Sequence, residues 1–285
     1  MKLTACMAAA MTLTAWSGAA NAAAILYGID NDTDSLVTIN TATGEVTTVG
    51  ATNPSTESFY NYIGMTVAAD GTVYVTDQNG FGVDGGLVVL DRTTGVELSR
   101  VSTDQASSGF SRAQTGLAFD ENGVLYSTQT LSSAASLNTI DPATGVVTTI
   151  DSLAEQIIGG NYPSTIAFSP DGVLFGMDNR RLISIDKTTG DVQEIGSDLA
   201  GIYGNNLSMA FAPDGTLYVA SRGINDYLVT LDPLTGAVLT SILLSSADSS
   251  LGLGGIAFFS DADVQPPSEV PLPAAAFLFA PFAAG

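Results

Sequence analysis

Acidic side chains are the groups in this sequence whose types and spacing best suit chemistry. Asp30, Asp32 and Asp34 alternate along one short segment. Hard cations such as Ca²⁺ take several oxygen ligands at once, and alternating aspartates supply them. The segment is not an EF-hand, because no glycine follows Asp34 and the twelfth position holds Thr41. It predicts a calcium loop, with a plain solvated turn as the alternative.

Two further aspartates end runs that resemble the one before Asp30. Asp77 closes VYVTD and Asp178 closes LFGMD, as Asp30 closes LYGID. If these runs are equivalent strands, their last side chains lie at one end of the fold. The candidate calcium ligands are Asp30, Asp32, Asp34, Asp77 and Asp178.

Aromatic residues beside amides form a second candidate group. They occur in irregular connections, such as FYNY at 59–62 and YGNN at 203–206. Rings stack on sugars and amides make paired hydrogen bonds, which suits a glycan or a peptide. Alternatively, the same rings plug a central channel or pack neighbouring units together. The candidate ligand-binding residues are Tyr60, Asn61, Tyr62, Asn161, Tyr162, Tyr203 and Asn205.

The absence of histidine excludes several classes of enzyme. The sequence has none, which removes Ser-His-Asp and Cys-His catalysis and nearly all zinc and copper sites. Hydrolysis by a pair of carboxylates is still open. However, Asp91, Asp141, Asp186 and Asp232 each precede a Thr-Gly pair, where an aspartate normally accepts local backbone hydrogen bonds. We therefore expect these four to be structural.

A repeated unit positions all of these residues. Residues 164–197 read as four short strands joined by tight turns, and copies recur about every 45 to 51 residues, the period of a four-stranded propeller blade. The third and fourth strands of each copy flank a Thr-Gly turn. These turns lie at Gly44, Gly95, Gly145, Gly190 and Gly236.

The first copy lacks its innermost strand, and that strand recurs at the far end of the repeats. Residues 25–30 open the first copy directly, whereas GGIAFFSD at 254–261 has no second strand after it. Pairing the two removes open edges from the ring. The sequence thus predicts an all-β fold over residues 23–263, a five-bladed β-propeller of four-stranded blades closed by its N-terminal and C-terminal strands.

The two ends of the chain indicate export. Residues 1–22 contain Lys2, an apolar run and Ala20-Asn21-Ala22, the pattern of a cleaved signal peptide. The composition is strongly acidic, with 8 Lys and Arg against 29 Asp and Glu and a net charge of −21. This charge disfavours nucleic acid and anionic membrane surfaces as partners. We expect a monomer that meets a membrane only through its C-terminal segment.

Two motifs resemble known families. VPLPA at 270–274 follows a Pro-rich spacer and is similar to C-terminal sorting signals of the PEP-CTERM type of Gram-negative bacteria, which implies processing by an exosortase. The segment 264–285 would then be a spacer with a partial sorting signal, because 12 residues from Ala274 make about 18 Å of helix against roughly 30 Å of hydrocarbon. IDPATG and LDPLTG resemble the blades of secreted bacterial propeller proteins.

We therefore expect an exported, surface-associated and non-enzymatic binding module. It is extracellular or on the outer surface of a Gram-negative bacterium, with the periplasm as an alternative. Its partner would be a glycan, a peptide or an envelope component. Two alternatives remain: an extracellular hydrolase or lactonase that uses carboxylates or calcium, and a purely structural envelope protein.

Overall fold

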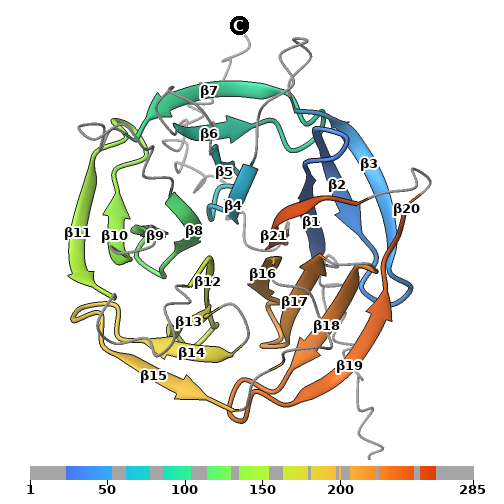
Figure 1. Cartoon of the computed structure of the whole chain (residues 1–285). Helices are drawn as coiled ribbons and strands as arrows, with labels where there is room; N and C mark the ends of the chain where they lie inside the picture. Colours follow the sequence, from blue (N-terminus) through green and yellow to red (C-terminus); the bar gives the residue numbers. More distant parts are fainter. Residues whose placement is uncertain are drawn as a thin grey trace, which may run out of the picture.

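Five sheets arranged around a ring make up the described part of the chain (Figure 1). The computed structural model describes residues 24–52, 62–77, 86–103, 114–129, 135–153, 163–178, 181–196, 199, 206–222, 225–246 and 251–260. Within these ranges all regular structure is strand, and no helix is long and apolar enough to cross a membrane. The predicted five-bladed β-propeller is confirmed.

Each blade is one sheet, and its strands are numbered in chain order. Blade 1 contains β1 (Ile25–Asp30), β2 (Ser35–Ile39), β3 (Glu45–Ala51), β20 (Ser245–Ser246) and β21 (Leu253–Phe259). Blade 2 contains β4 (Tyr62–Val67), β5 (Val73–Asp77), β6 (Gly86–Leu90) and β7 (Glu97–Ser102). Blade 3 contains β8 (Gln114–Phe119), β9 (Leu125–Gln129), β10 (Ser136–Ile140) and β11 (Val147–Ser152). Blade 4 contains β12 (Thr165–Phe168), β13 (Leu174–Met177), β14 (Leu182–Ile185) and β15 (Val192–Ile195). Blade 5 contains β16 (Asn206–Phe211), β17 (Leu217–Arg222), β18 (Tyr227–Leu231) and β19 (Val238–Leu243).

The turn between the third and fourth strands shows why these segments form hairpins. In blade 4, Asp186 Oδ1 accepts hydrogen bonds from the backbone N–H of Thr188 at 2.8 Å and of Thr189 at 3.1 Å. Gly190 then adopts a φ of 79°, which other residues reach only with strain. The equivalent aspartates of blades 2, 3 and 5 bind their turns in the same way. The structural role expected for these aspartates is confirmed.

The ring closes by pairing of its two ends, as the sequence predicts. β1 is antiparallel to both β2 and β21, with Tyr27 opposite Thr38 on one side and Ala257 on the other. A second contact lies at the outer rim, where β20 runs parallel to β3 (Figure 1). The N–H of Ser245 also donates to the carbonyl of Gly44 at 2.9 Å. Blade 1 is therefore held at both its inner and outer edges by chain from beyond residue 244.

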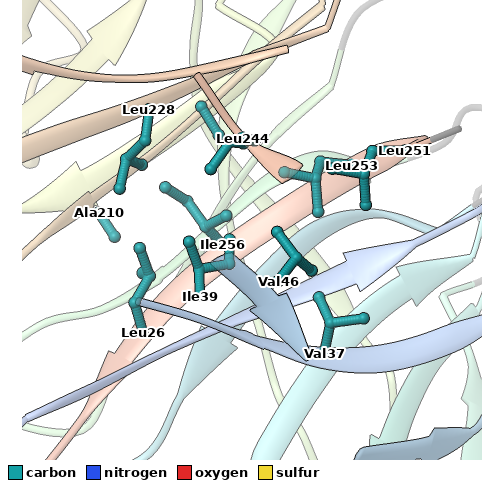
Figure 2. Close-up of a cluster of buried hydrophobic side chains, with 11 residues drawn as sticks. Leu26, Val37, Ile39, Val46, Ala210, Leu228, Leu244, Leu251, Leu253 and Ile256 are labelled. Carbon is teal, nitrogen blue, oxygen red and sulfur yellow. The ribbon is translucent and has the colours of Figure 1, made fainter. Parts of the chain in front are cut away.

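The core lies between blades. Figure 2 shows the cluster between blades 5 and 1. It combines Leu26 of β1 with Ile256 of the closing strand β21 and Leu228 of β18. Similar clusters join the other blades. Burial of apolar side chains on both faces of each sheet therefore stabilises the ring as a whole.

Inner strands of neighbouring blades approach one another closely. A Cβ added to Gly254 in β21 would lie 1.9 Å from the carbonyl oxygen of Tyr62, at the start of β4 in blade 2. One position of the repeat, a little further along the inner strands, holds only small residues. They are Gly64, Gly116, Thr165, Ser208 and Gly255. The inner wall of the ring thus depends on small side chains at its tightest contacts.

Candidate functional site

The two faces of the ring differ in how much of them the structure describes. One face, which we call the hairpin face, is formed by the turns at 68–72, 120–124, 169–173 and 212–216 and by the Thr-Gly turns. At the other ends of the strands, β1 leads into the described turn at 31–34. Six of the predicted ligand-binding residues lie outside the described residues. They are Tyr60, Asn61, Asn161, Tyr162, Tyr203 and Asn205.

Tyr62, the seventh predicted ligand-binding residue, is fully buried between blades 1 and 2. Asn31 clamps its backbone, because Asn31 Nδ2 donates to the carbonyl of Tyr62 at 2.8 Å and the N–H of Tyr62 donates to Asn31 Oδ1 at 2.9 Å. Burial raises the pKa of the Tyr62 phenol to about 12. This ring therefore packs blades together, the alternative that the sequence also allowed.

The predicted calcium loop is bound to its neighbours in the fold. Asp30 Oδ1 accepts from the backbone N–H of Gly252 at 2.7 Å, and its Oδ2 accepts from the Thr33 hydroxyl at 2.7 Å. Asp32 pairs with Arg222 of blade 5 at 2.9 Å. The backbone of Asp34 has a φ of 49°, and burial together with the Asp30 charge raises its pKa. The connection thus joins blade 1 to the closing strand and to blade 5.

Asp77 and Asp178 are buried and bound within their own blades. Asp77 forms an ion pair with Arg100 of β7, and Asp178 Oδ1 accepts from the N–H of Arg181 at 2.8 Å. Among the described residues, no three His, Cys, Asp or Glu side chains are grouped so as to hold a metal ion. The structure does not bring the five predicted ligands together, and calcium binding stays a prediction.

An open cavity lies at the hairpin face, where the central channel ends. Its volume is about 540 Å³, and a narrower cavity of about 160 Å³ in the channel shares its walls. The shared residues are the last or next-to-last of the inner strands. They are Val67, Phe119, Phe168, Phe211 and Phe258. We call the four phenylalanines the phenylalanine collar.

Aromatic pairs between blades hold the collar in place. Each collar residue packs on an aromatic residue of the preceding blade, in a T-shaped or tilted arrangement. The ring centroids lie 5.2 to 5.4 Å apart in the pairs Tyr74–Phe119, Tyr126–Phe168, Phe175–Phe211 and Tyr218–Phe258. All four collar residues stay partly exposed. The collar therefore presents fixed aromatic surface to the cavity.

Charged residues flank the collar. Lys187 Nζ lies 3.0 Å from Asp120 Oδ2 and 2.9 Å from Glu121 Oε1, and it stands 5.5 Å from the centre of the Phe168 ring. Arg92 lies over the ring of Phe259 at 3.6 Å. The ion pairs of Lys187 join blade 4 to blade 3, and the contact of Arg92 with Phe259 joins blade 2 to blade 1. The hydrogen bonds from Lys187 hold the pKa of Glu121 below its usual range.

Six further aspartates of the hairpin face are held in the charged form by their turns. Each accepts hydrogen bonds from threonine side chains or backbone amides, which stabilise the charged form and lower its pKa. They are Asp70, Asp91, Asp141, Asp186, Asp214 and Asp232. The hairpin face consequently keeps its negative charge in mildly acidic solution.

These lowered pKa values predict how stability depends on pH. A carboxylate whose pKa is lower in the folded protein stabilises it above the unfolded value, near 3.8 for Asp, and loses that effect as the pH falls through the folded value. The raised pKa of Asp34 acts in the opposite direction. We expect an unfolding free energy that changes little from about pH 7 to 5 and falls below about pH 4. Urea denaturation across this range measures it, and a decline that begins above pH 5 would contradict the expectation.

The sequence analysis placed the candidate site in the irregular connections between strands and missed the cavity at the hairpin face. A signal was present, because an inner-strand phenylalanine recurs in LAFD, IAFS, MAFA and IAFF. These phenylalanines line one cavity only because the five inner strands meet around one axis, and the sequence of a single repeat does not reveal that arrangement.

Comparison with known proteins shows the fold and the family. A chain of a nidogen/laminin complex is similar at 12% identity, covering 83% of this chain and 98% of that one, with a TM-score of 0.50. A streptogramin B lyase is similar at 14% identity, covering 79% of this chain and 67% of that one, with a TM-score of 0.45. A gluconolactonase from Xanthomonas campestris is similar at 15% identity, covering 71% of this chain and 70% of that one, with a TM-score of 0.46. At 12% identity, the likeness to the nidogen/laminin chain shows the fold alone.

No curated protein matches the sequence significantly. The profile of a repeat of unknown function, DUF6923, matches residues 18–165 and residues 52–210. Both matches span several blades and together cover more than half of the chain. The protein therefore belongs to the DUF6923 repeat family.

Proposed function

We propose that this protein is an exported, surface-associated and non-enzymatic binding module. The observation that supports this proposal most directly is the cavity of about 540 Å³ with its phenylalanine collar. Ligand sites in proteins are typically concave, largely apolar and of about 300 to 1,000 Å³. Export rests on the signal peptide predicted at residues 1–22, and surface association on the sorting signal predicted within 264–285. The partner is an extracellular glycan, a peptide or an envelope component.

The carboxylates of the cavity favour binding over hydrolysis. Asp120 and Glu121 line it, and both bind Lys187. Burial opposes ionisation of Asp120, but hydrogen bonds from the N–H of Val124 and from Lys187 outweigh it and lower the pKa. Hydrolysis by two carboxylates requires one of them to hold a proton near neutral pH. Because the pKa is lowered on both Asp120 and Glu121, neither is suited to be that acid.

Two assays on the purified protein test the proposal together. We expect no turnover of lactones or aryl glycosides, and we expect a rise in melting temperature with at least one ligand from a panel of soluble glycans and peptides. A ligand that binds the native state stabilises it by RT ln(1 + [L]/Kd). Turnover that disappears in Asp120→Asn would overturn the proposal in favour of a carboxylate hydrolase.

Calcium binding by the segment from Asp30 to Asp34 belongs to the proposal as a separate prediction. It requires the ion to compete with Arg222 for Asp32, and with Thr33 for Asp30. If the prediction holds, millimolar calcium raises the melting temperature by several degrees and EDTA reverses the rise. The same rise should be absent in Asp32→Asn. An unchanged melting temperature would assign these aspartates to holding blades 1 and 5 together.

A further inference from the structure

We propose that the cavity at the hairpin face binds small organic cations with an apolar body, such as ammonium ions carrying apolar substituents. This inference rests on the proposed function as a binding module and adds the class of ligand. Three features of the face support it: the size and lining of the cavity, the charge around it, and the cations that the protein already places on its aromatic rings.

The cavity has the size and surface that an apolar body needs. Its volume of about 540 Å³ is large enough for a small molecule or one residue of a larger ligand. Four phenylalanines occupy one position in successive inner strands, and the pairs between blades fix their rings. The faces of aromatic rings carry partial negative charge and attract cations. A fixed collar of this kind favours a rounded, positively charged apolar group.

Carboxylates surround the collar. Asp120 and Glu121 line the cavity, and Asp70, Asp171 and Asp214 lie in the short turns beside it. Two cations lie among these five carboxylates: Lys187 is shared by Asp120 and Glu121, and Arg92 lies over Phe259, so negative charge is in excess. A cleft lined by one sign of charge concentrates ions of the other sign. An anionic ligand would instead meet the repulsion of this face.

The protein already places cations against aromatic rings at this face. Lys187 Nζ stands 5.5 Å from the centre of Phe168, and the Arg92 guanidinium lies 3.6 Å from the centre of Phe259. Both distances are within the range of about 6 Å for a cation–π interaction. Phe168 belongs to the collar, so the collar faces a cation in the free protein. A bound organic cation would make the same kind of contact with the remaining rings.

The test compares a cation with a neutral molecule of the same shape. Choline and 3,3-dimethyl-1-butanol have the same shape, but choline has a positively charged nitrogen where the alcohol has a neutral carbon. Titration calorimetry on the purified protein should give choline at least about a tenfold lower Kd, and this preference should shrink in high salt, which screens the carboxylates. Equal affinities, or no binding of choline at all, would overturn the inference while leaving a binding module in place.

Two variants locate the site, and one serves as a matched control. Phe211→Leu keeps an apolar side chain of similar volume and should weaken choline by about tenfold, whereas Glu121→Gln should weaken choline and spare the neutral molecule. Glu194→Gln is the control, because Glu194 lies on the outer strand β15, paired with Arg181. Melting curves establish that each variant is folded. Unchanged affinity in both site variants would overturn the assignment to this cavity.

Discussion

Replacing Gly254 with alanine should lower the free energy of unfolding by about 3 kcal/mol or more, the upper range for adding atoms to a packed site. The added Cβ would lie 1.9 Å from the carbonyl oxygen of Tyr62 and 2.5 Å from Asn31 Nδ2. The first of these atoms is backbone, so a rotamer change does not relieve the clash. The inner strands of blades 1 and 2 would have to separate. Urea denaturation measures the loss.

Gly123 supplies the matched control for this substitution. It lies in a turn of the hairpin face, and a Cβ added there meets no atom within 4 Å. Its φ of 77° makes alanine strained, which costs about 1 kcal/mol. If Gly254→Ala cost no more than Gly123→Ala, the close approach of the inner strands would not limit stability.

Placing a charge on the closing strand should have the second large effect. Ile256 of β21 is 2% exposed and packs in the cluster between blades 5 and 1. In Ile256→Asp the new carboxylate would be buried without a partner, and the apolar contacts would be lost. We expect a loss of at least about 4 kcal/mol or no cooperative unfolding transition at all. Thermal unfolding followed by circular dichroism measures it.

The control for this variant lies on an outer strand. Leu98 of β7 is 63% exposed, so Leu98→Asp should change the unfolding free energy by less than about 0.5 kcal/mol. An equally mild effect of Ile256→Asp would mean that the ring is stable without its closing strand. That result would contradict the role assigned to β21.

The repeats and their closure were predictable because short motifs within each repeat specify its strands and turns. Asp186 and Gly190 mark a hairpin in any context, since the turn requires a hydrogen-bond acceptor and a residue that tolerates positive φ. The same pattern in every copy gave the number of blades. The lone inner strand at 254–261 then had one free edge to pair with. The structure adds the register of that pairing, with Tyr27 opposite Ala257.

The features that escaped prediction arise between copies. Asn31 read as part of an acidic loop, yet it binds the backbone of Tyr62, 31 residues away. Arg222 reaches Asp32 from blade 5 across 190 residues of sequence. The parallel pairing of β20 with β3 has no signature in the sequence, because β20 consists of only two residues, both serine. Contacts of this kind depend on how blades are placed around the ring, which no single repeat encodes.

The pairing of β1 with β21 also sets the order of events in folding. β1, the first strand of the ring, pairs with β21, which lies more than 220 residues later in the chain. Blades 2 to 5 are each formed from contiguous sequence, so each can form its sheet from nearby residues. Blade 1 cannot. Its completion closes a very long loop, the kind of step that slows folding and leaves intermediates with an unpaired edge. Blade 1 is therefore complete only once β21 has paired with β1.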